Sequence, residues 1–433
     1  MGRDDGMTGP NTGDVTGERL DVGFVPVECP GADGTGAVHT STLLIEHLSW
    51  YHDLTVYVTT QWEAERPLPA DDRVEYVIND GLSSLPHPLS EKVKALETET
   101  EALERHDLVH SYSSAFIPVL ADLEVPTLST LNSYLPVCPK ADMLYHGEEK
   151  CSGPGRAKCL RCIVSTAAGR WQGVDSELRS GYVSVGSIPF VERSMAAASG
   201  VDAYHALSPH LVRDYGALGF PEDRITVIPH FYDERFFSPV REYTNPIYRE
   251  EPISLLTVGA LSDIKDVDTV IEALAESRAR GHDVELRVAG KGGREESLRS
   301  LADDLGVADA IEWLGYVDHA RLPDVYDEAD VFVYSGILDE PFGRVMLEAL
   351  ASHTPILTSD VGSMREIVGP AGEVYQPGNP VGLADAFETL MSEYVAHQRA
   401  IPDHVRGFSP DVVIDSYLAL YEEVAALRTT VSP

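Results

Sequence analysis

The pair Glu340 and Glu348 is the arrangement in this sequence that points most specifically to chemistry. Both acids follow a short apolar run, Val331–Tyr334, which predicts a strand. Because proline suits the first turn of a helix, we expect a helix over Pro341–Ser352, with Glu348 about 10 Å further along its axis than Glu340. The same spacing also describes a solvated helix with two incidental acids. Its place after a strand and around a Pro-Phe-Gly sequence favours a site.

The start of this predicted helix is a candidate anion site. The free backbone N–H groups of Phe342, Gly343 and Arg344 would point outward together with the positive end of the helix dipole. Gly343 would also let the backbone approach a ligand closely. The element would thus offer a carboxylate, a phosphate-binding site and a second carboxylate. A nucleotide-sugar presents the matching order of sugar hydroxyls, diphosphate and ribose hydroxyls.

Four of the five cysteines, Cys138, Cys151, Cys159 and Cys162, lie within 25 residues. Two residues separate the last pair, the spacing with which two thiolates hold one zinc ion. The first pair is spaced unlike that of a zinc ribbon, so reduced thiols or a redox pair in a surface insertion are alternatives. We take all four as candidate ligands of a structural zinc. The fifth cysteine, Cys29, is expected to be a core thiol.

The stretch that contains these cysteines is basic. Between positions 138 and 170 six basic residues face three acidic ones. The basic ones are Lys140, Lys150, Arg156, Lys158, Arg161 and Arg170. Pairing with nearby carboxylates would explain them, at a small energetic gain for exposed groups. The sharper hypothesis is that Lys150, Arg156 and Lys158 face an acidic acceptor, such as a phosphate-bearing lipid or an acidic glycan.

Short apolar runs alternate with helix-length amphipathic segments along the second half, which predicts βαβ units and a parallel sheet. The predicted strands are Ser254–Val258, Val284–Ala289, Ala310–Leu314, Val331–Tyr334 and Pro355–Thr358. The predicted helices are Asp266–Arg280, Glu295–Leu305, His319–Asp327 and Pro341–Ser352. The first half shows the same rhythm more loosely. We therefore expect an α/β fold of two doubly wound, Rossmann-like domains facing across a cleft, with ligands at the carboxyl ends of the strands.

The organisation along the chain follows from these patterns. The predicted segments are a disordered tail (1–19), an N-terminal domain (20–237) with a Cys-rich insertion (138–170), a Pro-containing linker (238–252), a C-terminal domain (253–410) and a final helix (411–433).

These features together resemble the family 4 retaining glycosyltransferases of the GT-B fold, over nearly the whole chain. The matching motifs are the paired Glu340 and Glu348, the loop from Val258 through Gly259 to Lys265, the run Tyr326–Val333, Ile228-Pro229 with Asp233, and the Gly-rich Gly34-Thr35-Gly36. The resemblance implies a nucleotide-sugar donor, UDP- or GDP-linked, held by the C-terminal domain. It implies a glycan or lipid-linked acceptor held by the N-terminal one, and a last helix that crosses back to that domain.

The resemblance also implies roles for single residues. Glu340 would bind hydroxyls of the transferred sugar, Glu348 would bind the ribose, and Lys265 would neutralise the diphosphate. Gly34, Thr35 and Gly36 would close on the phosphates, and Gly259 and Lys291 lie in loops of the donor side. Catalysis would consist of positioning and of stabilising the leaving diphosphate, with retained anomeric configuration and no required metal cofactor.

Two positions depart from the family pattern. Ala260 stands where the family has an arginine beside the phosphate lysine, and Asn132 stands where it has a histidine. Arg344 could offset the first loss, and Asn132, the second catalytic candidate, can donate a hydrogen bond but not a proton. The alternatives are therefore a nucleotide-sugar epimerase, a sugar phosphorylase or a catalytically silent nucleotide-sugar-binding module.

The overall composition limits the partners. The 433 residues carry 33 Lys and Arg against 70 Asp and Glu, a formal net charge of −37. Such a field repels nucleic acid. Acid excess spread along the chain with few lysines predicts a halophilic protein, because at about 1 M salt the Debye length is roughly 3 Å and self-repulsion is largely screened. An ordinary acidic mesophilic protein is the alternative. We expect no transmembrane segment, no signal peptide and a cytoplasmic location, with the inner face of the membrane as an alternative.

Overall fold

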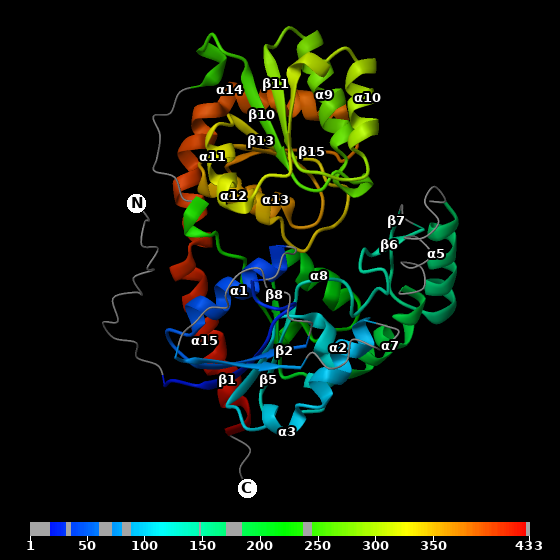
Figure 1. Cartoon of the computed structure of the whole chain (residues 1–433), viewed down its shortest axis with the longest axis vertical. Coiled ribbons are helices and arrows are strands. Elements are labelled where there is room, and N and C mark those ends of the chain that lie inside the picture. Colours follow the sequence, from blue (N-terminus) through cyan, green and yellow to red (C-terminus); the bar gives the residue numbers. More distant parts are fainter. Residues whose placement is uncertain are drawn as a thin grey trace. The chain divides into compact units, whose positions relative to one another are not determined.

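The computed structural model describes residues 18–31, 36–59, 72–79, 88–146, 149–169, 184–236 and 245–429. The chain forms two compact units (Figure 1). The first contains the chain up to Ala206, Val212–Val227 and the chain from Ile414 onward, and the second contains Leu207–Leu211 and Ile228–Val413. Ile228–Phe236, which we expected at the end of the N-terminal domain, thus lies with the second unit. Most of the predicted tail and part of the predicted linker lie outside the described residues.

The first unit is built on a parallel sheet in the order β3-β2-β1-β4-β5-β8-β9. Its described strands are β1 (Asp21–Val25), β2 (Asp53–Val58), β3 (Val74–Ile78), β4 (Leu108–Ser111), β5 (Thr127–Leu131), β8 (Ala203–Ala206) and β9 (Ile225–Val227). The central strands β4, β5 and β8 are buried along their whole length. This is why their sequences read as short runs without polar alternation.

Helices cover this sheet and extend beyond it. They are α1 (Gly36–Leu48), α2 (Pro88–Glu97), α3 (Thr100–Leu103), α4 (Ile117–Leu120), α5 (Arg156–Gly169), α7 (Ile188–Ala197), α8 (Pro209–Ala217) and α15 (Pro410–Thr429). An antiparallel hairpin of two-residue strands, β6 (Leu144–Tyr145) and β7 (Glu149–Lys150), precedes α5. The sequence patterns did not predict this hairpin, because strands this short carry no measurable periodicity.

The second unit repeats the doubly wound plan with the strand order β12-β11-β10-β13-β14-β15. The strands are β10 (Ile253–Val258), β11 (Val284–Ala289), β12 (Ile311–Gly315), β13 (Val331–Tyr334), β14 (Ile356–Ser359) and β15 (Gly372–Tyr375). The helices are α9 (Val267–Ala279), α10 (Glu295–Asp304), α11 (Leu322–Asp327), α12 (Arg344–Ala351), α13 (Met364–Val368) and α14 (Pro380–Val405). All adjacent strands in this order are parallel, as the βαβ rhythm predicted.

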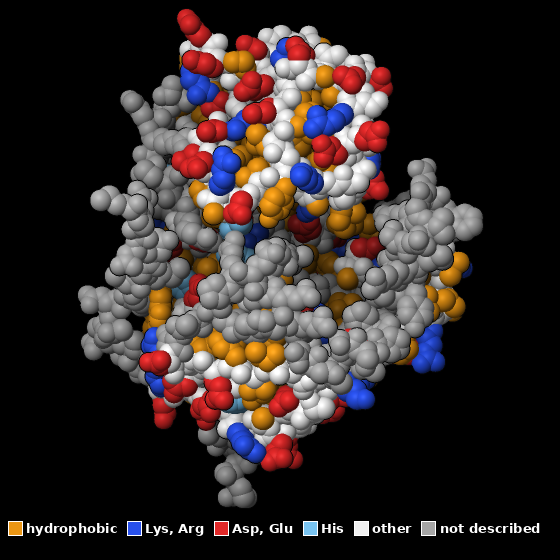
Figure 2. Space-filling model, viewed as in Figure 1, with side chains coloured by type: hydrophobic (Ala, Val, Ile, Leu, Met, Phe, Trp, Pro, Cys, Tyr) orange, Lys and Arg blue, Asp and Glu red, His pale blue; other side chains and the backbone are white. Residues whose placement is uncertain are grey.

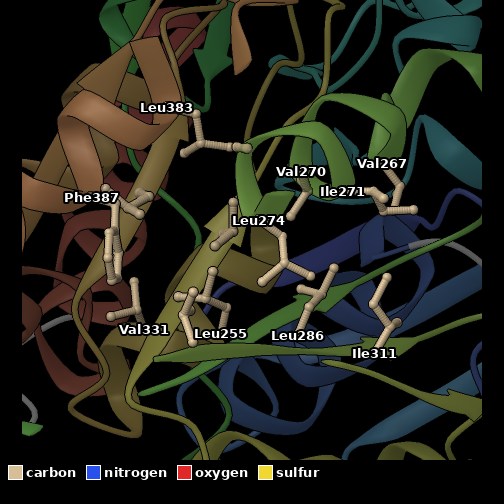
Figure 3. Packing of buried hydrophobic residues seen from close by; sticks show 14 of the residues in the cluster. Leu255, Val267, Val270, Ile271, Leu274, Leu286, Ile311, Val331, Leu383 and Phe387 are labelled. Atoms are coloured by element: carbon tan, nitrogen blue, oxygen red, sulfur yellow. The ribbon is translucent and has the colours of Figure 1, made fainter. Parts of the chain in front are cut away.

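The core of the second unit lies between its sheet and helices α9, α10 and α14 (Figure 3). Leu255, Leu286 and Val331 point from three neighbouring strands toward Leu274 of α9 and Phe387 of α14. Each fully buried side chain of this kind contributes about 1.5–3 kcal/mol through removal of apolar surface from water. This packing holds the strand ends, and therefore the loops that follow them, in a constant arrangement.

The opposite face of the sheet is covered by α12 and its neighbours. Thr358 of β14 contacts the sulfur of Met346 in α12, whereas the adjacent Leu357 faces the α14 side. Successive strand residues therefore serve the two faces in turn, which completes the α/β/α layering.

Helix α12 begins later than predicted, at Arg344 with Gly343 as its N-cap residue. The prediction that Pro341 opens the helix was wrong. Phe342 is nearly buried, and its ring lies edge-on to His230 at 4.8 Å between ring centroids. The backbone before Gly343 is not helical, and the Met346 N–H bonds to the Gly343 carbonyl at 3.0 Å, so the N-terminus of the helix lies at Arg344 and Val345.

Among the described residues, no helix combines the length and apolarity that crossing a bilayer requires.

Candidate functional site

The carboxyl ends of β10, β11 and β13 form a pocket in the second unit. In the sheet, β10 lies between β11 and β13, and the chain runs outward from it in both directions. The loops after these neighbouring strands therefore diverge, which is where open α/β sheets bind ligands. The residues that line the pocket and matter here are Gly259, Ala260, Leu261, Lys265, Tyr334 and Ser335.

Backbone hydrogen bonds join the loops after β10 and β11. The Gly259 N–H donates to the Ala289 carbonyl at 2.9 Å, and the Leu261 N–H donates to the Lys291 carbonyl at 3.0 Å. A Cβ at Gly290 would lie 1.8 Å from the Gly259 carbonyl oxygen, so only glycine fits there. Lys291, a predicted donor-side residue, belongs to this loop, and its side chain is exposed.

The structure brings Lys265 and Glu340 together. They lie 75 residues apart in the chain, and the Lys265 Nζ forms an ion pair with Glu340 Oε1. The Lys265 ammonium also lies over the Tyr334 ring, 5.2 Å from its centroid, and the Ser335 hydroxyl donates to the Lys265 carbonyl at 2.7 Å. Both ion-pair side chains are about a quarter exposed (26% and 23%), so the pair borders solvent and is open to exchange with a ligand.

Tyr334 sits beneath this ion pair and was not predicted as a site residue. It is 4% exposed, and its hydroxyl has no hydrogen-bond partner among the described residues. Burial, and then the charge of Glu340, raises the pKa of Tyr334 well above its ordinary value, so the phenol stays protonated. A Cβ at Gly336 would lie 2.4 Å from the Tyr334 hydroxyl oxygen, so this glycine makes room for the ring.

Glu348 is a buried and oriented carboxylate on α12. It is 5% exposed, and the Tyr326 hydroxyl donates to its Oε2 at 3.0 Å. The His319 Nε2 lies 3.6 Å from its other oxygen. Burial, and then the charge of Glu348, raises the pKa of Tyr326 well above its ordinary value, so Tyr326 remains a hydrogen-bond donor. Tyr326 was expected only as part of the run Tyr326–Val333 and His319 only as the start of a helix, and neither was predicted as a site residue.

The other predicted donor-side residues surround the start of α12. Gly343 packs against Met364, whose sulfur would lie 3.0 Å from a Cβ added at this glycine. Arg344 is half-buried at the first helical position, and Phe342 occupies the aromatic contact with His230. Gly343 therefore has a packing role that the sequence did not reveal.

The predicted residues of the first unit have mixed outcomes. Gly34 and Thr35 lie outside the described residues, and Gly36 opens α1 as an exposed residue. Asn132, directly after β5, donates from its Nδ2 to the Tyr112 carbonyl at 2.8 Å, and its Oδ1 accepts from the Ser114 hydroxyl at 3.3 Å. Its amide therefore joins the ends of β4 and β5.

The three candidate acceptor residues have partners within the first unit. Lys150 donates to Asp214 at 2.8 Å, and Arg156 donates to Glu192 at 2.6 Å. Lys158 donates to the Gly153 carbonyl at 2.9 Å. The four candidate zinc ligands, Cys138, Cys151, Cys159 and Cys162, lie beside the β6–β7 hairpin and on α5 as free thiols.

Comparison with known proteins agrees with the geometry of the second unit. Residues 244–403 match the family model described as glycosyl transferases group 1. The chain therefore carries a group 1 glycosyl transferase domain. The phosphatidyl-myo-inositol mannosyltransferase of Mycobacterium leprae is 33% identical over 166 residues, which make up 37% of this chain and 44% of that protein. The chain spans from 37% to 55% of the length of the curated relatives it matches.

Solved structures resemble the chain over nearly its whole length. The sucrose-phosphate synthase of Thermosynechococcus elongatus has a TM-score of 0.66 at 19% identity, covering 94% of this chain and 100% of that one. Anabaena HepE, crystallised with UDP, has a TM-score of 0.63 at 17% identity, with the same two coverages. At these identities the likeness concerns the fold. The two units are the two Rossmann-like domains of the GT-B fold.

Proposed function

We propose that this protein is a retaining glycosyltransferase that moves a sugar from a UDP- or GDP-linked donor to a glycan or lipid-linked acceptor without a required metal. The observation that carries the proposal is the Lys265–Glu340 ion pair at the switch point of the second sheet, in a group 1 glycosyl transferase domain. The UDP and UDP-glucose bound by the structural neighbour HepE support a nucleotide-sugar donor. Retention follows from the resemblance to family 4.

The ion pair suggests how the site would receive a donor. The diphosphate carries more negative charge than one carboxylate, so it would compete with Glu340 for the Lys265 ammonium. Glu340 would then be free to accept hydrogen bonds from sugar hydroxyls, and the N–H groups at the start of α12 would face the phosphates. Glu348, held by Tyr326, would accept from the ribose hydroxyls. These groups would stabilise charge on the departing nucleotide diphosphate.

The test is release of nucleotide diphosphate from a panel of UDP- and GDP-sugars, measured by chromatography with and without a chelator. Glu340→Gln keeps the shape of the side chain but removes its charge. We expect the rate of diphosphate release to fall by roughly 100-fold or more. The matched control is Glu296→Gln, an exposed acid on α10 of the same unit, which should leave the rate unchanged. Equal rates for wild type and Glu340→Gln would refute the proposed role.

A silent nucleotide-sugar-binding module is the second candidate, because the Asn132 amide is engaged in backbone support and Ala260 replaces the family arginine. Donor binding measured by calorimetry, with no diphosphate released in the same samples, would favour it. The acceptor role of Lys150, Arg156 and Lys158 and the cytoplasmic location remain predictions. The triple alanine variant should raise the acceptor KM and leave donor binding unchanged.

A further inference from the structure

Two of the clustered cysteines share one face of α5. Cys159 and Cys162 are three positions apart and are 8% and 5% exposed, whereas Leu160 and Val164 of the same helix are 48% and 58% exposed. The hairpin lies against the cysteine face, because the His146 N–H donates to Cys162 Sγ at 3.2 Å. The helix therefore buries these two thiols together with Ile163, which is 4% exposed, and turns Leu160 and Val164 outward.

The other two cysteines flank the same hairpin. Cys138 precedes β6 and is 6% exposed, and Cys151 directly follows β7. The Cys151 N–H donates to the Met143 carbonyl at 2.7 Å, which places this residue at the base of the hairpin. Two thiols thus come from the hairpin base and two from the helix face that the hairpin covers.

Backbone N–H groups are directed at two of the four sulfurs. Cys159 Sγ accepts from Gly155 at 3.4 Å, in addition to the bond from His146 to Cys162. Such bonds are weak to a neutral thiol and strong to a thiolate, and they are the outer contacts that orient metal ligands.

The backbone of this segment is held in unusual conformations. Ala141, Met143 and His146 have φ of 60°, 53° and 55°, three of the five non-glycine residues with positive φ in the described part of the chain. Each costs about 1 kcal/mol or more unless the surroundings compensate. The β6–β7 hairpin, whose strands have only two residues each, does not offset this cost by itself.

Basic residues accompany each cysteine in sequence. Lys140 follows Cys138 by two positions, and Lys150, Lys158 and Arg161 directly precede the other three cysteines. A zinc ion with four thiolates carries a net charge of about −2, so cations beside each ligand would stabilise it. This gives the basic segment a second role beside the ion pairs of Lys140 with Asp142 and of Lys150 with Asp214.

We propose that Cys138, Cys151, Cys159 and Cys162 together bind one structural zinc ion that holds the β6–β7 hairpin on α5. Binding replaces four S–H bonds by four Zn–S bonds and releases four protons, with no change of oxidation state. Among the described residues no three of these sulfurs lie within 4.8 Å of one another, whereas tetrahedral zinc requires about 3.8 Å. Zinc binding therefore requires side-chain rotation, and a change of staggered rotamer moves a cysteine sulfur by about 3 Å.

The experiment is a zinc determination by mass spectrometry on the full-length protein, purified under reducing conditions without chelator. We expect about one zinc per chain for the wild type and for the control Cys29→Ser, whose buried thiol lies outside this segment. Single serine variants at Cys138, Cys151, Cys159 and Cys162 should each lose most of the metal. Retention of zinc by all four variants would contradict the proposal.

A second measurement covers variants that fail to fold. Wild-type protein stripped of metal and titrated with Co²⁺ should develop the thiolate-to-cobalt charge-transfer absorption of a tetrahedral sulfur site, with saturation at about one equivalent. Zinc below about 0.1 per chain together with no cobalt band overturns the proposal. A mass two hydrogens lower before reduction, which reveals a disulfide among these residues, overturns it as well.

Discussion

At the scale of residues, the site depends on groups that hold the predicted carboxylates in place. Glu348 is an effective hydrogen-bond acceptor only if its carboxylate keeps one orientation, and Tyr326 sets that orientation from α11. The single Tyr326 hydroxyl proton is shared between Glu348 Oε2 at 3.0 Å and the Val345 carbonyl at 3.1 Å. Because Tyr326 is fully buried, water cannot take over its hydrogen bond to Glu348 when the hydroxyl is removed.

Tyr326→Phe tests this positioning role. The variant removes one hydroxyl without creating a large cavity, so we expect a loss of about 1 kcal/mol in unfolding free energy. We also expect the donor KM to rise roughly 5- to 10-fold with a smaller change in kcat, because a misoriented Glu348 binds ribose less well. The control is Tyr394→Phe, which removes a hydroxyl bonded to the Asp330 carbonyl at 2.8 Å. It should cost similar stability and leave KM unchanged, and equal KM values for both variants would exclude the role.

At the scale of elements, the loops after β10 and β11 act as one unit. Gly290 has a φ of 156°, and its missing Cβ leaves space for the Gly259 carbonyl. Gly292 allows a similar approach, because a Cβ there would lie 2.1 Å from the Leu261 carbonyl oxygen. The shape of the pocket therefore depends on Gly290 and Gly292, because their lack of a side chain lets the backbones of the two loops touch.

Gly290→Ala should separate these two loops. We expect a loss of about 2 kcal/mol or more in unfolding free energy and weaker nucleotide binding, because both the positive φ and the contact with Gly259 become unfavourable. Gly293→Ala is the matched control, since a Cβ there meets nothing within 4 Å. Denaturant unfolding and calorimetry with UDP and GDP measure the two effects. The explanation fails if the two variants behave alike.

Buried polar contacts help to hold the C-terminal helix α15 on the first unit. In the first unit, His110 of β4 is fully buried, and its two ring nitrogens contact the Tyr421 hydroxyl of α15 at 2.7 Å and the Thr130 hydroxyl at 2.8 Å. Burial, and then the nearby His205, lowers the pKa of His110 well below 6.5. The histidine therefore stays neutral in the folded protein.

This linkage predicts a loss of stability in acid. Below about pH 6.5 an unfolded His110 takes up a proton that the folded protein does not, so unfolding becomes more favourable as pH falls. Relative to wild type, His110→Gln should lose stability less steeply, by up to about 1.4 kcal/mol per pH unit between about pH 5 and 6.5. Urea unfolding across this range measures both slopes. Parallel curves would contradict the prediction, because they would show that His110 takes up its proton in the folded protein as readily as in the unfolded chain.

At the scale of the whole molecule, charge is the dominant feature. The full chain has a net charge of −37, and Figure 2 shows acidic side chains scattered over the described part of the face in view. Their mutual repulsion destabilises any compact state at low ionic strength. The composition predicted a halophilic protein because salt screens this repulsion.

Salt should therefore stabilise the protein. Between about 0.1 M and 2 M KCl we expect Tm to rise by about 5 °C or more, equivalent to roughly 2 kcal/mol for units of this size. Most of the rise should occur at the lower concentrations if screening is the cause, since the Debye length shortens fastest there. Thermal unfolding in KCl and NaCl checks this, and a Tm that does not change with salt would contradict the prediction.

The sequence by itself determined the parts of this protein that depend on local spacing. Apolar runs placed β10, β11 and β13 within about one residue of their observed bounds, because parallel strands must be apolar on both faces. The Glu340–Glu348 spacing and its context led to the correct domain family. Local patterns failed at the start of α12, where Phe342 packs against His230 and the helix begins at Arg344 although Pro341 predicted an earlier start.

Only the tertiary structure decided which distant residues meet. The ion pair of Lys265 with Glu340, the hydrogen bond from Tyr326 to Glu348 and the contact of Gly290 with Gly259 each join separate strand–loop segments. The return of α15 to the first unit is a contact of the same kind, which the family resemblance implied and no local pattern could predict. These contacts arise because a doubly wound sheet gathers the carboxyl ends of strands that are far apart in the chain, and no periodicity within one segment carries that information.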